Sequence, residues 1–87
     1  MVKQQVTVKN ATGLSLKPTE YLYKIALLYK AHTAFEYNGG TANAKSILSI
    51  LGSGVKCGDE ITLVCSGNDE EEALAALVAA VEEGLGE

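Results

Sequence analysis

Hydrophobic and polar residues alternate in several segments of the chain. In the first segment, Val2, Val6 and Val8 are separated by lysine, glutamine and threonine residues, which is the period of a strand with one buried face. Further along, Asn38-Gly39-Gly40 indicates a hairpin turn, because these residues accept positive φ angles at little cost. The pattern therefore predicts four strands, at residues 2–9, 33–37, 41–43 and 60–66.

Three other segments carry hydrophobic residues at helical spacing, which gives each helix one apolar face. The clearest stripe consists of Leu22, Ile25, Ala26 and Tyr29. A second stripe, late in the chain, consists of Leu74, Leu77, Val78 and Val81. We predict helices over about residues 16–29, 46–51 and 70–83, with Gly84 and Gly86 fraying the end of the last one.

The residues at the helix ends agree with these boundaries. Ser15 is a favourable N-cap residue, and Pro18 is tolerated in the first turn, where a missing N–H costs nothing. Gly52-Ser53-Gly54 ends the second helix, and Asn68 or Asp69 caps the third. The order βαββαβα predicts an α/β sandwich, in which three helices cover one face of an open, four-stranded antiparallel sheet.

Composition narrows the class of protein. The 87 residues are expected to fold as one domain, residues 1–87, and the formal charge of -4 argues against a nucleic-acid binder. A local basic face around the first helix and Lys45 stays compatible with that charge. No apolar run suits a signal peptide or a membrane span, so we expect a cytoplasmic protein. Cys57 and Cys65 lack a metal or redox spacing and are expected to be reduced thiols that pack as small hydrophobes.

The turn Thr12-Gly13-Leu14-Ser15, which leads into the first helix, is the first candidate site. A helix start offers free N–H groups and a partial positive charge, which suit a phosphate or another anion. Lys17 adds a full positive charge within reach. The alternative is that Ser15 only caps the helix and that Lys17 is a solvated surface residue.

The second candidate site is the start of the short second helix. A phosphate on Ser46 would lie at that helix start, where its negative charge is favourable. Ile47, Leu48 and Leu51 cannot all face inward on so short a helix, so we expect at least one to offer an apolar surface to a partner. The alternative is that Ser46 is a simple N-cap.

No catalytic arrangement can be assembled from the chain. His32 is the only imidazole, and no Asp, Cys or Ser stands at a recognisable spacing from it, so we expect it at a surface or a strand edge. The acidic run Asp69-Glu70-Glu71-Glu72 is explained by a helix start on a solvated face. We therefore expect a binding or regulated protein rather than an enzyme, with no metal ion or cofactor.

Together these residues resemble the HPr family, the small phosphocarriers of the bacterial sugar phosphotransferase system. The resemblance covers the whole chain and implies the open-faced βαββαβα sandwich of that family. It rests on Thr12-Gly13-Leu14, Lys17-Pro18, Glu36-Tyr37-Asn38-Gly39, Asn43-Ala44-Lys45-Ser46-Ile47 and Glu83-Gly84-Leu85-Gly86-Glu87.

The chain departs from the family where its members carry a phosphorylatable histidine. Ser15 occupies that position, followed by Leu16 in place of a small residue and Lys17 in place of arginine. A phosphohistidine passes its phosphoryl group on through a labile P–N bond, whereas a phosphoserine is a stable ester. A serine hydroxyl also needs a base to become a nucleophile. The resemblance therefore implies a protein that is not a working phosphocarrier.

Ser46 matches the regulatory serine of the family, with Asn43 and Lys45 before it. The resemblance implies a histidine-less, Crh-like regulator of carbon catabolite repression, a monomer or weak homodimer. An HPr kinase/phosphorylase would switch it at Ser46, and a LacI-type catabolite control protein would then bind it. The expected anion-binding and partner-binding residues are Ser15, Lys17, Lys45, Ile47, Leu48 and Leu51. Two alternatives stay open: a carrier that still accepts phosphoryl from enzyme I, and a diverged HPr-fold binding module of another pathway.

Overall fold

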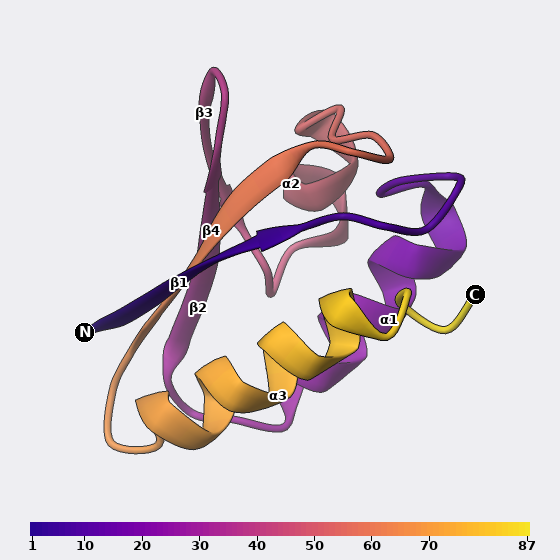
Figure 1. Cartoon of the computed structure of the whole chain (residues 1–87). Helices are drawn as coiled ribbons and strands as arrows, with labels where there is room; N and C mark the ends of the chain where they lie inside the picture. The colour runs from indigo at the N-terminus through magenta and orange to yellow at the C-terminus, as the bar shows by residue number, and fades with distance from the viewer.

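The computed structural model describes residues 1–87 and contains four strands and three helices in the predicted order (Figure 1). The elements are β1 (Val2–Thr7), α1 (Leu16–Leu27), β2 (His32–Tyr37), β3 (Gly40–Asn43), α2 (Ile47–Gly52), β4 (Glu60–Ser66) and α3 (Glu70–Glu82). Every bound lies within two residues of its predicted position, so the βαββαβα prediction is confirmed. None of the helices is long and apolar enough to cross a membrane.

All four strands belong to one antiparallel sheet with the order β1-β4-β2-β3. At one edge of the sheet, β1 pairs with β4 along its whole length, from Val2 opposite Cys65 to Thr7 opposite Glu60. The predicted hairpin joins β2 to β3. The first and the last strand of the chain are therefore neighbours, and β4 is held between β1 and β2.

The helices cover one face of this sheet (Figure 1). Helix α3 packs across β1 and β4, α1 lies beside α3, and α2 contacts both α1 and β3. Along β4, the buried residues Ile61, Leu63 and Cys65 alternate with more exposed ones, because successive side chains of a strand point to opposite faces. The predicted open-faced sandwich is confirmed.

The core lies between the sheet and the helices. Leu22 of α1, Phe35 of β2 and Leu77 of α3 are fully buried in it, and burying such a side chain stabilises the fold by about 1.5–3 kcal/mol. The predicted stripe of α3 is largely confirmed, with Val78 and Val81 buried as well and Leu74 partly buried.

The predicted stripe of α1 is confirmed only in part. Leu22 and Ala26 are buried, whereas Ile25 and Tyr29 are partly buried. The helix ends at Leu27, two residues earlier than predicted. Its last turn tightens, because the N–H of Tyr29 donates to the carbonyl of Ala26, three residues back, at 3.3 Å.

Asp69 stands at the N-cap position of α3, but its side chain does not cap the helix. Its carboxylate accepts the N–H groups of Lys30 and Ala31, both at 2.8 Å, and so holds the α1–β2 loop against the start of α3. Gly67 permits this approach, because a Cβ there would lie 2.8 Å from the Cα of Ala31. Of the two predicted caps, Asp69 and not Asn68 stands at the N-cap position. The prediction that its side chain caps the helix is wrong.

Replacing Leu22 with alanine tests the packing of the core. Leu22→Ala should lower the free energy of unfolding by about 2–5 kcal/mol, because it leaves a cavity under α1. Leu28→Ala is the matched control, since the Leu28 side chain is 76% exposed, and it should change stability by less than about 0.5 kcal/mol. Urea unfolding measures both variants, and equal losses would contradict the assignment of the buried face.

Candidate functional site

The turn before α1 packs backbone to backbone against the segment before β4. Gly13 has a positive φ of 63°, and a Cβ there would lie 2.7 Å from the Cα of Lys56. The N–H of Leu14 donates to the carbonyl of Val55 at 3.0 Å. Glycine is required at this approach, and the contact fixes where α1 begins and how Ser15 is presented.

Ser15 stands at the N-cap position of α1, and its carbonyl accepts the N–H of Thr19 at 2.9 Å. Its exposed hydroxyl makes no capping hydrogen bond. An N-cap hydroxyl usually bonds to the N–H of the second or third helical residue, and the third residue here is Pro18, which has none. The prediction that Ser15 caps α1 is confirmed for its position and wrong for its side chain.

The backbone N–H groups of Leu16 and Lys17 have no acceptor within the chain. With the exposed side chain of Lys17 they form an electropositive spot that suits an anion. The only histidine, His32, is exposed and follows the other end of α1, a helix about 18 Å long. The helix start can therefore hold an anion, but the only imidazole lies too far from Ser15 to activate its hydroxyl as a base.

The segment after α3 folds back onto the Ser15 turn. Three successive positive φ angles reverse the chain, 95°, 54° and 83° at Gly84, Leu85 and Gly86. Glu87 Oε1 then accepts hydrogen bonds from Thr12 Oγ1 at 2.9 Å and from Asn10 Nδ2 at 3.2 Å. The prediction that these glycines fray α3 is wrong, because Leu85 between them is buried and Glu87 is bonded to the turn.

The hydrogen bonds at Glu87 change its acidity. The hydroxyl of Thr12, and next the amide of Asn10, stabilise the carboxylate and hold the pKa of Glu87 below its ordinary value. The same Asn10 Nδ2 donates to the carbonyl of Gly13 at 2.6 Å, so it joins the reversed segment to the turn. The sequence alone offers no reason to assign a role to Glu87. The one indication of a chain reversal before it is the pair of glycines, Gly84 and Gly86, on either side of Leu85.

The start of α2 is held by a network of hydrogen bonds. The Ser46 hydroxyl accepts the N–H of Ser49, the third residue of the helix, at 3.2 Å. The Ser49 hydroxyl accepts the N–H of Asn43 at 2.9 Å, and Asn43 Oδ1 accepts the N–H of Lys45 at 2.8 Å. The predicted N-cap role of Ser46 is confirmed, and its partly buried hydroxyl is oriented toward the helix.

Lys45 directs its ammonium group toward the end of α1. Its Nζ donates to the carbonyl of Tyr29 at 2.7 Å. The exposed Lys17 and Lys24 of α1 therefore supply the local basic face that the sequence predicts. Lys45 is only partly exposed, and its ammonium group is hydrogen-bonded to the backbone.

Helix α2 exposes an apolar surface, as predicted. Leu48 is 83% exposed and Leu51 is 37% exposed, whereas Ile50 is buried and Ile47 is intermediate. Helix α1, which contacts α2, and its C-cap residue add three exposed leucines that the sequence did not predict: Leu16, Leu27 and Leu28. Their exposure could have been predicted, because none of these leucines belongs to the buried stripe that the sequence predicts for α1.

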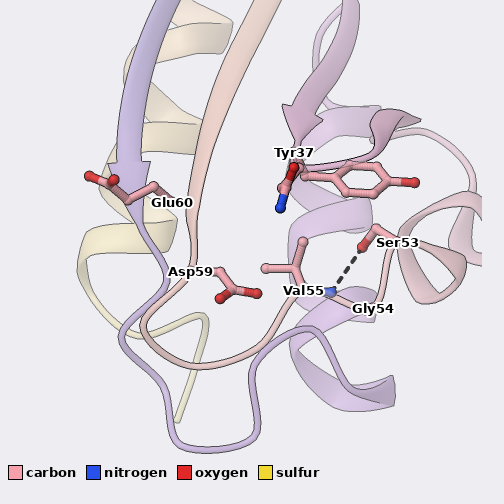
Figure 2. Close-up of a pocket in the computed structure, with 7 residues that line it drawn as sticks. Tyr37, Ser53, Gly54, Val55, Asp59 and Glu60 are labelled. Atoms are coloured by element: carbon pink, nitrogen blue, oxygen red, sulfur yellow. Dashed lines mark hydrogen bonds between the residues drawn. The ribbon is translucent and has the colours of Figure 1, made fainter.

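One cavity, of about 220 Å³, opens between the β2–β3 hairpin and the segment that leads into β4 (Figure 2). It is lined by Tyr37, Asn38, Ser53, Gly54, Val55, Asp59 and Glu60. Figure 2 shows the Ser53 hydroxyl hydrogen-bonded to the N–H of Val55, at 3.4 Å. The lining has two carboxylates and no lysine, which does not suit an anion, and none of the predicted site residues belongs to it.

Both cysteines are free thiols. Cys65 is buried in the core, as predicted, and burial raises the pKa of its thiol. Cys57 is exposed in the turn before β4, so the prediction of a packed hydrophobe is wrong for this residue. No three His, Cys, Asp or Glu side chains gather where they could hold a metal ion.

The fold and these two helix starts define a class of protein. An open-faced βαββαβα sandwich with a cationic start to α1 and a serine-capped α2 is the architecture of the small phosphotransferase-system proteins and their regulatory relatives. The family described as the PTS HPr component phosphorylation site matches residues 2–83. The chain belongs to the HPr family.

Curated relatives and solved structures agree with this assignment. The chain is 39% identical over 82 residues to the HPr-like protein Crh of Halalkalibacterium halodurans, covering 94% of this chain and 98% of that protein. It is 35% identical over 83 residues to the phosphocarrier protein HPr of Mycoplasma genitalium, covering 94% of each.

Among solved structures, HPr-C-His from Thermoanaerobacter tengcongensis has a TM-score of 0.95 at 36% identity, over 100% of this chain and 98% of that one. Crystalline Crh of Bacillus subtilis, a dimer with a swapped domain, has a TM-score of 0.78 at 38% identity, over 97% of both chains. The predicted resemblance to the HPr family and to Crh is confirmed.

Thr12→Val tests the contact between Glu87 and the Ser15 turn. Loss of the hydroxyl donor should raise the pKa of Glu87 toward its ordinary value of about 4.5. Because the folded-state pKa is lowered, this contact stabilises the fold above the unfolded pKa and is lost as the pH falls through the folded one. A carbonyl-carbon NMR titration of the Glu87 side chain measures the shift.

Thr41→Val is the control for this titration, because the exposed Thr41 on β3 makes no side-chain hydrogen bond. It should leave the Glu87 titration unchanged. An identical Glu87 pKa in Thr12→Val and in the unaltered protein would show that the contact does not form in solution.

Proposed function

We propose that this protein is a cytoplasmic, Crh-like regulator of carbon catabolite control that does not carry phosphoryl groups in the sugar relay. The observation that carries the proposal is the geometry at Ser15. The resemblance to the family implies that this residue takes the phosphohistidine position. Its hydroxyl is exposed, and the only histidine of the chain, His32, lies beyond the other end of α1. A phosphoryl group attached there would form a stable ester at a helix start and would be a poor donor to the next protein.

The Ser46 turn supports a switch. Its hydroxyl already accepts the N–H of Ser49 at the start of α2, so the oxygens of a phosphate on Ser46 can accept the same donor. The helix start favours the added negative charge. In this proposal an HPr kinase/phosphorylase modifies Ser46, and the modified protein binds a LacI-type catabolite control protein, as a monomer or weak homodimer.

The surface around Ser46 supports a protein partner. Leu48 and Leu51 expose apolar area on α2, with Ile47 beside them, and Lys17 presents a cation at the start of α1. Apolar area with charge at its rim is typical of a protein-binding surface. The protein acts by binding in this proposal and catalyses no reaction itself.

Incubation with an HPr kinase/phosphorylase and ATP tests the proposed switch. The unaltered protein should gain one phosphate, Ser46→Ala should gain none, and Ser15→Ala should gain it at the normal rate. Mass spectrometry of the intact protein and its peptides measures the site. Phosphate on Ser15, no phosphate at all, or equal binding of the repressor with and without phosphate would exclude the regulatory proposal.

The competing function, a carrier that accepts phosphoryl from enzyme I, is favoured by one observation, the free N–H groups of Leu16 and Lys17. With phosphoenolpyruvate and enzyme I, we expect no acid-labile label on the unaltered protein. Ser15→His should restore acid-labile labelling, because it puts a nucleophilic nitrogen on an intact anion-binding helix start. Labelling of the unaltered protein would support the carrier function instead.

A further inference from the structure

The loop between α1 and β2 is held by two side chains from distant parts of the chain. Lys45 donates from Nζ to the carbonyl of Tyr29 at 2.7 Å. The carboxylate of Asp69 accepts the next two N–H groups, those of Lys30 and Ala31, both at 2.8 Å. A cation from the turn before α2 and an anion from the start of α3 therefore fasten three consecutive residues.

The two charged groups also act on each other. The pKa of Asp69 is lowered, first by its hydrogen bond from Lys30, then by the one from Ala31, and least by the positive charge of Lys45. Removing the Lys45 ammonium from this junction would leave the Tyr29 carbonyl without this donor. The hydrogen bond to the Tyr29 carbonyl is therefore the contact that holds the ammonium at this junction.

The side chains of Lys45 and Ser46 form hydrogen bonds to different parts of the chain. Lys45 and Ser46 are the last two residues of a turn that is closed by the N–H of Ser46, which donates to the carbonyl of Asn43 at 3.1 Å. The Ser46 hydroxyl reaches the N–H of Ser49, whereas Lys45 reaches the carbonyl of Tyr29. Asn43 Oδ1 holds the N–H of Lys45 at 2.8 Å, which fixes the backbone from which the lysine extends.

We propose that Lys45 is a positioning residue, which braces the turn before α2 against the end of α1 and does not bind a phosphate on Ser46. This inference rests on the proposed function. A phosphate dianion is a stronger acceptor than a carbonyl, so attraction alone would draw the ammonium to it. The hydrogen bond from the ammonium to the Tyr29 carbonyl opposes that movement, and the Ser46 hydroxyl is directed toward the N–H of Ser49 instead.

The brace has a consequence for partner binding. Leu27 and Leu28 are exposed at the end of α1 and directly precede Tyr29. Leu48 and Leu51 are exposed on α2, which follows the turn that contains Lys45. The contact between Lys45 and Tyr29 therefore sets the position of one apolar surface relative to the other. A partner that covers both surfaces meets them in a fixed arrangement, which lowers the entropy lost on binding.

Lys45→Met removes the ammonium and keeps the apolar stem, and Lys45→Arg restores a charged donor. Lys30→Met is the matched control, because the Lys30 side chain is exposed in the same loop and makes no hydrogen bond or ion pair. Amide hydrogen exchange followed by NMR is measured on the full unphosphorylated chain. In Lys45→Met, the amides of Lys45, Ser46 and Ser49 should exchange about tenfold faster, with rescue by arginine and no change in the control.

A second measurement separates bracing from phosphate binding. Phosphoserine is incorporated at position 46 during translation, so the result does not depend on whether any kinase recognises the protein. Phosphorus NMR then gives the second pKa of the phosphate in each background. If Lys45 only braces the turn, that pKa is the same with Lys45→Met as with Lys30→Met. A rise of about one unit in Lys45→Met alone would show a direct ion pair and overturn the inference, as would unchanged amide exchange.

Discussion

The pairing of β1 with β4 is the constraint on which the rest of the structure depends. It joins the first strand of the chain to the last, and it continues past the end of β1, where Val8 exchanges backbone hydrogen bonds of 2.9 and 2.7 Å with Asp59 and Gly58. The Ser15 turn begins directly after this ladder. Gly13 and Leu14 then press against Val55 and Lys56, so the start of α1 is placed by the sheet edge and by the segment before β4.

The two helix starts show how one residue type serves two roles. Both Ser15 and Ser46 stand at N-cap positions, but the third helical residue is Pro18 in α1 and Ser49 in α2. Proline has no N–H to offer, so the Ser15 hydroxyl cannot make the bond to the third helical residue that Ser46 makes. Ser49 has one, so the Ser46 hydroxyl is engaged and oriented. The two helix starts therefore differ in whether the serine hydroxyl is free or engaged.

Charged side chains connect these elements across the fold. Asp69 fastens the α1–β2 loop to α3, Lys45 fastens the end of α1 to the turn before α2, and Glu87 fastens the segment after α3 to the Ser15 turn. Each contact bridges segments that are far apart in sequence, and none of them involves the exposed leucines of α1 and α2.

The amino-acid sequence alone determined the order of the elements and their bounds to within two residues, because strand and helix periods are local properties. It also determined Ser15 and Ser46 as helix starts and the apolar exposure of α2. Only the tertiary structure decided that the Ser15 hydroxyl caps nothing, that Asp69 and Lys45 bind the α1–β2 loop, and that Glu87 reaches Thr12. The physical reason is that a polar side chain takes the nearest partner in space, and the partners of Lys45, Asp69 and Glu87 come from segments that only the packed fold brings together.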